Sequence, residues 1–446
     1  MKTIYFLTFL VLCTSNFLYA QSWVPVGPAA FSQGEAFVQQ IAVDGETPYV
    51  AYMDRKYGDK ATVMKFNGTD WVNVGPAGFT PDAMTEMSFA MIGSTPYVAF
   101  DHKSQRGKIS VMKFDGAAWV FVGNEGFIEK GSSVGLAAGN GVLYLSFEDW
   151  ENKSKASVLK FTGSKWEYVG NRGFSSGITY NKVEIAVDGN TPYVAYRDYD
   201  ADYKASVMKF NGTSWDLLGV AGFSDKTHDP YQGFIVKNGT PYLASWDVNY
   251  NPMVYKFDGK AWGKLGVPFL TTDQVSSQSI CFAKNGILYF VFADWGNGRK
   301  ATVVKYDGTK WSVVGDVASK GGAETISIAC SESNIPYIAY RDNYSMRRTT
   351  VMKLGNATNA TNIEATQGLK VYPNPGKGLF TVEINDFQND YVNIEVFNPI
   401  GQVIFSRQSQ FSNKIEIDLS DFENGIYYFK VTNNKVVRSK SIMINR

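Results

Sequence analysis

The sequence predicts an all-β chain: a seven-bladed β-propeller with four antiparallel strands per blade, followed by a small C-terminal β-sandwich. The first observation is a series of tryptophans spaced 47 to 49 residues apart, namely Trp23, Trp71, Trp119, Trp166, Trp215, Trp262 and Trp311. The second is that the repeats hold four short runs of alternating apolar residues bounded by Gly, Asn, Asp or Pro, a pattern typical of strands. A repeat of this length with four strands is typical of a propeller blade.

In the first repeat the expected strands cover 37–43, 48–53, 61–66 and 71–74. The first and third turns are short and turn-coded, as at Asp44-Gly45 and Asn67-Gly68, whereas the second connection (54–60) and the link to the next repeat (75–85) are longer. Antiparallel pairing puts the short turns on one side, the turn face, and the longer connections on the other, the loop face. Function is expected on the loop face, because variable loops usually carry it.

Ring closure follows from counting strands. The seventh repeat has strands at 336–340 and 349–354 but no tryptophan strand after them, while Trp23-Val24-Pro25-Val26-Gly27 stands alone before the first repeat. We expect this N-terminal strand to complete the seventh blade and leave no free sheet edge. The tryptophans are interpreted as structural, each packing the outer edge of its blade against the neighbour.

The two ends of the chain differ from the repeats. Residues 1–20 hold Lys2, an apolar stretch from Ile4 to Leu12 and Ala20 at the expected cleavage point, which is typical of a secretory signal peptide. No other apolar stretch approaches the ~18 residues of a membrane-spanning helix. The expected organisation is a signal peptide at 1–20, a propeller at 21–354, a polar linker at 355–368 and a C-terminal domain at 369–446.

The C-terminal motifs are specific. Tyr372-Pro373-Asn374-Pro375 precedes Gly378-Leu379-Phe380, and Val396–Gln402 precedes Asn424-Gly425-Ile426-Tyr427. In order and spacing they resemble the type A sorting domain of the Bacteroidetes type IX (Por) secretion system. The resemblance implies a β-sandwich that the type IX machinery recognises, with Tyr372, Pro373, Asn374, Pro375, Gly425 and Tyr427 in its motifs. It also implies a secreted or outer-membrane surface-attached protein; the alternative is an immunoglobulin-like sugar-binding appendage.

The composition of the chain limits the kinds of partner that it is expected to bind. A formal net charge of +1 over 446 residues gives no electrostatic basis for binding nucleic acid or an anionic membrane, and we expect a monomer. Cys281 and Cys330 fall in the innermost strands of neighbouring blades. Aligned on Tyr289 and Tyr337 they are one residue out of register, so their side chains are expected to point to opposite faces. Free thiols are therefore favoured over a disulfide, although export would permit one.

Acidic and basic residues recur where the second connection leaves and rejoins the sheet. The acidic residues are Asp54, Asp149, Asp198, Asp247, Asp294 and Asp342, and the basic ones are Lys60, Lys108, Lys155, Lys204, Lys300 and Arg348. We interpret them as cross-strand ion pairs of the scaffold. In the second blade His102 replaces the aspartate, and the other histidine, His228, lies in an inter-blade loop. Either is a candidate for acid–base catalysis with a loop carboxylate, although surface histidines are commoner.

Aromatic residues gather in the second connections: Tyr57, Trp150, Tyr199, Tyr203, Tyr250, Trp295 and Tyr344. An exposed ring gains from packing locally or from meeting a ligand, and sugar C–H groups stack on such rings. Asp198, Asp200 and Asp202 alternate as Ca²⁺ ligands do, but Tyr203 stands where an EF-type loop needs glycine. No other cofactor is expected.

The sequence thus favours an exported carbohydrate-binding module over an enzyme. One alternative is a polysaccharide lyase or glycoside hydrolase using His102 or His228 with loop carboxylates and tyrosines. The other is a protein-binding adhesin that uses the same face. An enzyme should concentrate its departures from the repeat in one pocket, whereas a lectin should repeat small sites in several blades.

Overall fold

The computed structural model describes residues 21–226, 233–266, 274–355, 369–384, 391–398, 403–410, 414–432 and 437–446. The chain divides into two compact units, Met1–Asn356 and Ala357–Arg446. No helix within these described ranges is long and apolar enough to cross a membrane.

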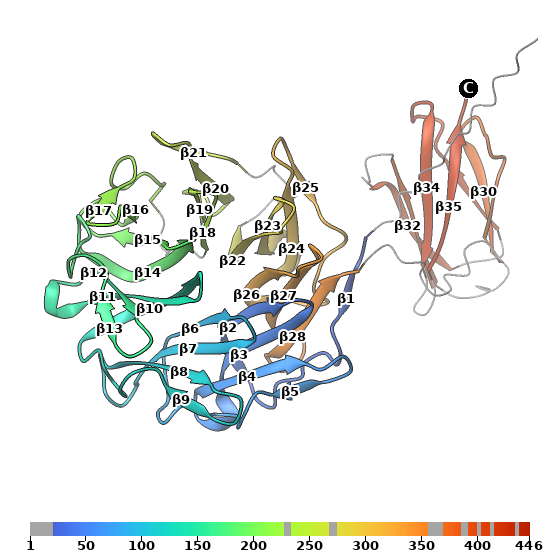
Figure 1. Ribbon diagram of the computed structural model, residues 1–446. Coiled ribbons are helices and arrows are strands. Elements are labelled where there is room, and N and C mark those ends of the chain that lie inside the picture. Colours follow the sequence, from blue (N-terminus) through green and yellow to red (C-terminus); the bar gives the residue numbers. More distant parts are fainter. Residues whose placement is uncertain are drawn as a thin grey trace, which may run out of the picture. The chain divides into compact units, whose positions relative to one another are not determined.

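Unit 1 holds seven four-stranded antiparallel sheets arranged around a common centre (Figure 1). This confirms the seven-bladed propeller. Blade one consists of β2 (Ala36–Asp44), β3 (Thr47–Asp54), β4 (Lys60–Phe66) and β5 (Trp71–Asn73). Blade two consists of β6 (Met87–Ile92), β7 (Thr95–Asp101), β8 (Ile109–Phe114) and β9 (Trp119–Phe121). Blade three consists of β10 (Gly131–Gly139), β11 (Val142–Asp149), β12 (Lys155–Phe161) and β13 (Trp166–Tyr168). Blade four consists of β14 (Thr179–Asp188), β15 (Thr191–Asp198), β16 (Lys204–Phe210) and β17 (Trp215–Leu217). Blade five consists of β18 (Phe234–Lys237), β19 (Thr240–Trp246), β20 (Pro252–Phe257) and β21 (Trp262–Lys264).

Blade seven is built from both ends of the unit. Blade six consists of β22 (Val275–Phe282), β23 (Leu288–Asp294), β24 (Lys300–Tyr306) and β25 (Trp311–Val313), and blade seven of β26 (Ala323–Cys330), β27 (Pro336–Asp342), β28 (Arg348–Leu354) and β1 (Trp23–Pro25). The N-terminal strand β1 pairs antiparallel with β28, with Trp23 opposite Leu354. The prediction that this strand closes the ring is confirmed.

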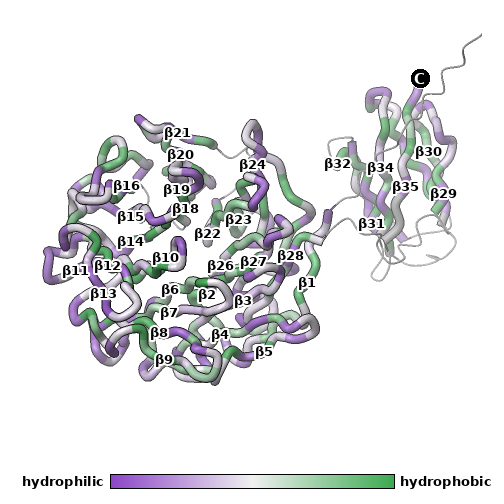
Figure 2. The backbone as a smooth tube through the Cα atoms, viewed as in Figure 1, coloured by the Kyte–Doolittle hydropathy of each residue, from purple (hydrophilic) through white to green (hydrophobic). Residues whose placement is uncertain are grey.

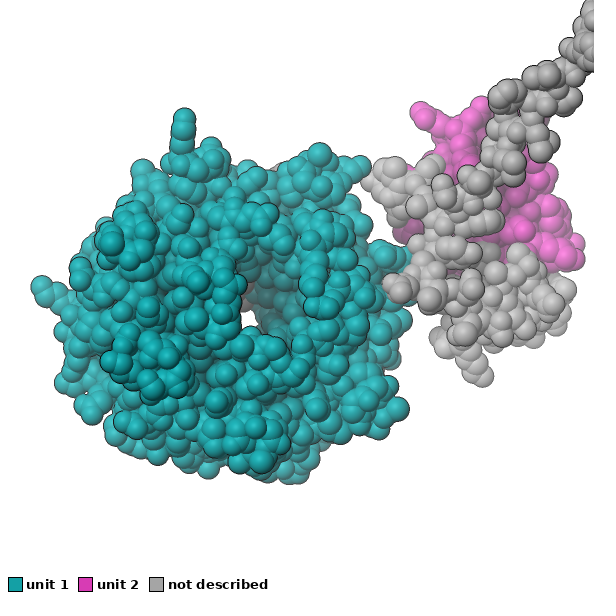
Figure 3. All heavy atoms as spheres, viewed as in Figure 1, with its two compact units in different colours: residues 1–356 teal, residues 357–446 magenta. Residues whose placement is uncertain are grey.

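The first strand of each blade is the innermost one. Each innermost strand contacts those of the two adjacent blades, so β2, β6, β10, β14, β18, β22 and β26 form a closed ring. Unit 1 is hollowed at its centre (Figure 3). Hydrophobic residues recur along the strands (Figure 2) and pack between neighbouring blades, as Val63 of blade one does with Val98 and Phe100 of blade two.

The tryptophans join each blade to the one before it. Each of the seven repeated tryptophans donates from its indole Nε1 to a backbone carbonyl of the preceding blade, at 2.7 to 3.4 Å. The donors and acceptors are Trp23 and Val314, Trp71 and Val26, Trp119 and Val74, Trp166 and Val122, Trp215 and Val169, Trp262 and Leu218, and Trp311 and Leu265. A phenylalanine from the inter-blade loop often stacks on the ring, as Phe79 does on Trp119 at 3.8 Å between centroids. Each indole therefore joins two blades both by a hydrogen bond and by apolar packing.

The expected aspartate–lysine ion pairs are wrong for blades one and three. The backbone register does place Asp54 opposite Lys60, but the buried Asp54 carboxylate accepts from the Lys56 backbone N–H and the Thr62 hydroxyl. Lys60 Nζ instead donates to the Pro81 carbonyl. In blade three the Asp149 carboxylate accepts from Ser157 and pairs with Arg172. The carboxylates turn inward because loop N–H groups and strand hydroxyls there need an acceptor.

Three of the second connections contain a short 3₁₀ turn directly after the aspartate. These are η1 (Arg55–Tyr57), η2 (Trp150–Asn152) and η3 (Trp295–Asn297). The Asp54 side chain accepts from the Lys56 N–H and so caps η1. The cap therefore fixes the start of this loop in blade one, and the side chains of Asp149 and Asp294 make no such cap at η2 and η3.

Unit 2 is a β-sandwich of two sheets. The three-stranded sheet has the order β29 (Leu369–Tyr372), β30 (Leu379–Ile384) and β33 (Lys414–Asp418), and the four-stranded sheet has the order β32 (Val403–Gln410), β31 (Tyr391–Phe397), β34 (Gly425–Thr432) and β35 (Val437–Ile444). Fully buried side chains from both sheets, including Val382, Ile394 and Phe429, form one core.

Candidate functional site

Blade four carries a cluster of three tyrosines on the loop face. Tyr180 belongs to the innermost strand β14, and Tyr199 and Tyr203 belong to the second connection. The rings of Tyr180 and Tyr199 each stand edge-on to Tyr203, with centroids 5.2 and 5.1 Å away and interplanar angles of 82° and 83°. This is a favourable aromatic geometry, so the cluster is a fixed arrangement.

An arginine side chain contacts two of the three tyrosine rings. The Arg197 guanidinium lies 5.3 Å from the centroid of Tyr180 and 5.0 Å from that of Tyr203, within cation–π range. Tyr180 and Tyr199 nevertheless remain 42% and 48% exposed. We call Tyr180, Tyr199, Tyr203 and Arg197 the tyrosine cluster. Sequence reasoning missed Tyr180 and Arg197, because both lie in strands rather than in the loop.

The two loop tryptophans share one geometry in blades three and six. Trp150 Nε1 donates to the Ser132 hydroxyl and Trp295 Nε1 to the Ser276 hydroxyl, both at 3.1 Å. Trp150 is half-buried, whereas Trp295 is 39% exposed and has the Arg299 guanidinium 3.9 Å from its ring centroid. Arg299 covers one face of that ring, so only the other face is open to a ligand.

The remaining loop aromatics lie singly in their blades. Tyr57 is half-buried, and its hydroxyl donates to Gln33. Tyr250 packs against the core between blades five and six. Tyr344 of blade seven is 81% exposed and makes no ring contact with any described residue. The seven predicted aromatics therefore form no single site, and the structure brings only Tyr199 and Tyr203 together.

The three carboxylates suggested for Ca²⁺ do not converge. Asp198 is buried and accepts from the Ser206 hydroxyl at 2.7 Å, Asp200 accepts from the Ile178 N–H, and Asp202 pairs with Lys226 at 2.6 Å. Among the described residues, no group of three His, Cys, Asp or Glu side chains could hold a metal ion. The three side chains thus bond to different groups, and calcium binding by them stays a prediction.

His102 is buried, with 1% of its surface exposed. Its Nε2 lies 2.7 Å from the Ser110 hydroxyl, so the imidazole fills the place that the aspartate fills in other blades. Burial lowers the pKa of His102. This placement gives His102 a role in the scaffold and leaves it no access to a substrate. His228, the other candidate for catalysis, lies outside the described residues.

Two glutamates, the half-buried Glu86 before β6 and the buried Glu148 of β11, each bond to the innermost strand of the next blade. Glu86 of blade two accepts from the Val134 N–H of blade three, and Glu148 of blade three accepts from the Asn181 N–H of blade four, at 3.1 and 3.3 Å. Burial raises the pKa of both, and the Glu86 charge raises that of Glu148 further. Both carboxylates therefore serve as bridges between blades.

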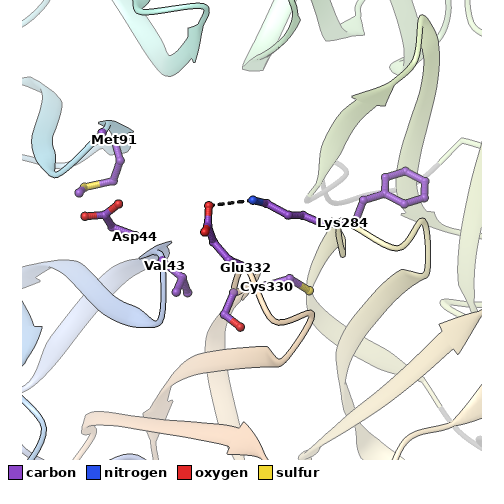
Figure 4. A pocket seen from close by; sticks show the side chains of 10 residues that line it. Val43, Asp44, Met91, Lys284, Cys330 and Glu332 are labelled. Atoms are coloured by element: carbon purple, nitrogen blue, oxygen red, sulfur yellow. Dashed lines mark hydrogen bonds and ion pairs between the residues drawn. The ribbon is translucent and has the colours of Figure 1, made fainter.

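Two cavities lie on the turn face, where no site was expected. One of about 280 Å³ lies at the ends of the innermost strands and is lined by Val43, Asp44, Met91, Lys284, Cys330 and Glu332 among others (Figure 4). The other, of about 600 Å³, lies between Tyr337 and Lys353 of blade seven and Pro48 and Phe66 of blade one. The tyrosine cluster lines neither cavity and is an exposed platform.

The sorting motif residues are built into the sandwich. The Asn374 side chain donates to the Ser441 carbonyl and accepts from the Met443 N–H, both at 2.9 Å, and so holds its segment against β35. Tyr427 is buried and its hydroxyl donates to the Glu423 carbonyl. Tyr372 donates to Glu383. The peptide bonds preceding Pro373 and Pro375 are both cis, and Gly425 begins β34.

Residues 370–445 match the family model of the secretion system C-terminal sorting domain. The C-terminal domain is a type IX sorting domain. It directs export by the type IX secretion system to the cell surface or the extracellular space. No curated protein sequence matches the chain.

The chain is similar at low sequence identity to several solved structures. A SapL1 lectin bound to α-methyl fucoside is 12% identical, with 66% of this chain and 99% of that chain covered and a TM-score of 0.48. The fucose-binding lectin of Aleuria aurantia, described as a six-bladed propeller, is 17% identical, with 66% and 98% covered and a TM-score of 0.41. A mutant Trypanosoma rangeli sialidase with trans-sialidase activity is 9% identical, with 94% and 88% covered and a TM-score of 0.43.

Proposed function

We propose that this protein is a carbohydrate-binding protein that acts outside the cell, with glycans binding to the loop face of the propeller. The observation that carries the proposal is the tyrosine cluster. Two of its rings, Tyr180 and Tyr199, are more than 40% exposed, yet both contact the ring of Tyr203, and the Arg197 guanidinium lies over Tyr180 and Tyr203. Such exposed and ordered aromatic surface marks a contact site on a soluble protein.

The surroundings of the cluster suit a sugar. A sugar ring presents C–H groups on one face and hydroxyls at its edge. Tyr180 and Tyr199 supply faces for stacking, while the exposed Asp200 and Asp202 accept from hydroxyls and Lys226 donates to them. Because Tyr203 and Arg197 hold the rings, little side-chain entropy is lost on binding.

Trp295 of blade six offers a second stacking surface on the same face. Its Nε1 is fixed by Ser276, and the ring face opposite Arg299 is available. The half-buried Trp150 keeps the same serine contact and offers less surface. We propose Trp295 as a secondary contact for a glycan long enough to reach beyond blade four.

We also propose the processing of the chain. Residues 1–20 act as a signal peptide, and the junction between the propeller and the sorting domain falls within 355–368. Both segments lie outside the described residues, apart from Gly355. The proposal rests on the apolar composition of the first segment and the Asn, Ala and Thr composition of the second.

A glycan array probed with the purified secreted chain tests the binding function. The expected result is retention of one class of glycan, with no new reducing ends released from it on incubation. Release of reducing ends would favour the polysaccharide-degrading alternative. No retained glycan, together with binding to a surface protein, would favour the adhesin. Either outcome would overturn the proposal.

A further inference from the structure

The innermost strands of blades six and seven are held side by side by a ladder of contacts. The Ser277 hydroxyl accepts from the Ile326 N–H at 2.7 Å and the Ser279 hydroxyl accepts from the Ile328 N–H at 3.2 Å. In both contacts the partners are 49 residues apart. The next step of this ladder is Cys281 with Cys330, also 49 residues apart, and their Sγ atoms lie 3.1 Å from each other.

The two thiols meet because the blades follow one another around a ring. Cys281 pairs with Tyr289 in β23, and Tyr289 packs toward Ile338 and Tyr340 of blade seven. In blade seven Tyr337 pairs with Ala329, so Cys330 is one residue further along and faces the other way, toward blade six. In a ring of blades, one face of each sheet packs against the opposite face of the next sheet. The expectation that the thiols point apart was therefore wrong, because the one-residue offset is what brings them together.

We propose that Cys281 and Cys330 form an intramolecular disulfide during export, cross-linking the innermost strands of blades six and seven. The Sγ atoms need to approach by roughly 1 Å to reach the ~2.05 Å of an S–S bond. The sorting domain shows that the chain leaves the cytoplasm, and disulfides form and persist in exported proteins.

The oxidant is a protein disulfide carrier of the export compartment. The Cys330 thiolate attacks one sulfur of the carrier disulfide, breaking that bond and forming a mixed disulfide. The Cys281 thiolate then attacks Cys330 Sγ, and the carrier leaves as a dithiol that has gained both electrons and both thiol protons. The carrier is needed because it accepts the two electrons; burial raises the pKa of the Cys281 thiol, which slows its step at neutral pH.

The thiols lie beside a route from solvent. Cys330 lines the cavity of about 280 Å³ on the turn face, near the ion pair of Lys284 with Glu332 (Figure 4). That ion pair and the bond from the Asn285 N–H to Asn334 continue the contacts between the two blades beyond the cysteines. Both thiols are half-buried, so the cross-link can form in the folded propeller as well as during folding.

The test is thiol trapping in the chain secreted by its own cells. The protein is unfolded in denaturant with iodoacetamide and no reductant, and its mass is measured. We expect neither Cys281 nor Cys330 to be alkylated and the mass to be about 2 Da below that of the dithiol form. Alkylation of both residues in the freshly secreted chain would overturn the proposal.

Matched variants separate the cross-link from packing. We expect reductant to lower the Tm of the secreted wild-type chain by about 5 °C and to leave the Tm of a Cys281→Ser, Cys330→Ser double variant unchanged. The single variant Cys281→Ser should expose one alkylatable thiol at Cys330. If reductant lowered the Tm of the double variant equally, the stabilising role of the bond would be refuted.

Discussion

The Nε2 atom of His102 lies 2.7 Å from the Ser110 hydroxyl, the same distance that separates the Asp198 carboxylate from the Ser206 hydroxyl two blades further on. In each blade this hydroxyl also accepts a backbone N–H of the inter-blade loop, from Gly126 or from Gly222. The imidazole therefore replaces a carboxylate in a contact that holds the base of the loop.

Stability should fall on acidification because of His102. Burial depresses its pKa in the folded state below the ordinary value of about 6.5. Its stabilising contribution is therefore present above that value and is lost as the pH falls, when only the unfolded chain takes up the proton. Urea unfolding at pH 7.5 and 5.5 should show a loss about 1 kcal/mol larger for the wild type than for His102→Gln. Equal losses would contradict this account.

Removing one indole N–H should destabilise the ring of blades. Trp119→Phe keeps most of the apolar surface but leaves the Val74 carbonyl without its 2.7 Å donor. We expect a loss of about 1–3 kcal/mol in the free energy of unfolding, measured with denaturant. Trp311→Phe is the matched control, because its bond to Leu265 is 3.4 Å long, and its loss should be smaller.

Deleting the closing strand should weaken the whole propeller. Without residues 21–27, β28 presents an unpaired edge and the Trp23 contacts with blade six disappear. Burial of one indole is worth about 4–6 kcal/mol by surface area, so a lower Tm for the entire unit is expected in calorimetry. A thermal transition that matched the full-length chain would show that β1 is dispensable.

Deleting residues 369–446 should stop export across the outer membrane. The propeller has its own core and should still fold, so it should accumulate in the periplasm, as followed by cell fractionation and immunoblotting. The full-length Tyr344→Ala variant is the control and should reach the surface or the medium. Normal surface display of the truncated chain would contradict the role of the sorting domain.

The fold was predictable because it is periodic. The tryptophan spacing and the Asp-Gly and Asn-Gly turns predict blades, turns and closure, because the same four-strand pattern recurs in each repeat. Side-chain partners were less predictable. Asp54 and Lys60 are opposite in the register as expected, yet the carboxylate turns inward to Thr62, because a buried hydroxyl and loop N–H groups compete for it. The meeting of Cys281 with Cys330 depends on the rotation between blades, which a sequence alignment does not contain.

The candidate site was predictable only in part. The loop position of Tyr199 and Tyr203 pointed to the loop face, but their arrangement depends on Tyr180 and Arg197, which come from strands. Tyr180 resembles an ordinary strand residue in the sequence, and the charge of Arg197 does not reveal which rings it contacts. Tyr344 has a similar place in its repeat but makes no ring contact with any described residue, whereas the cluster tyrosines contact one another. The sequence does not show this difference.

The most direct test of the account is the affinity of the secreted chain for its best-bound glycan, measured by calorimetry for three forms of the protein. Stacking on an aromatic ring is worth ~1–3 kcal/mol, so the Tyr180→Ala, Tyr199→Ala double variant should bind at least about 5-fold more weakly than the wild type. Tyr344→Ala should bind as the wild type does, and all three forms should be fully folded at the assay temperature, as checked by thermal unfolding. Unchanged affinity in the double variant, or an equal loss in Tyr344→Ala, would contradict the assignment of glycan binding to the tyrosine cluster.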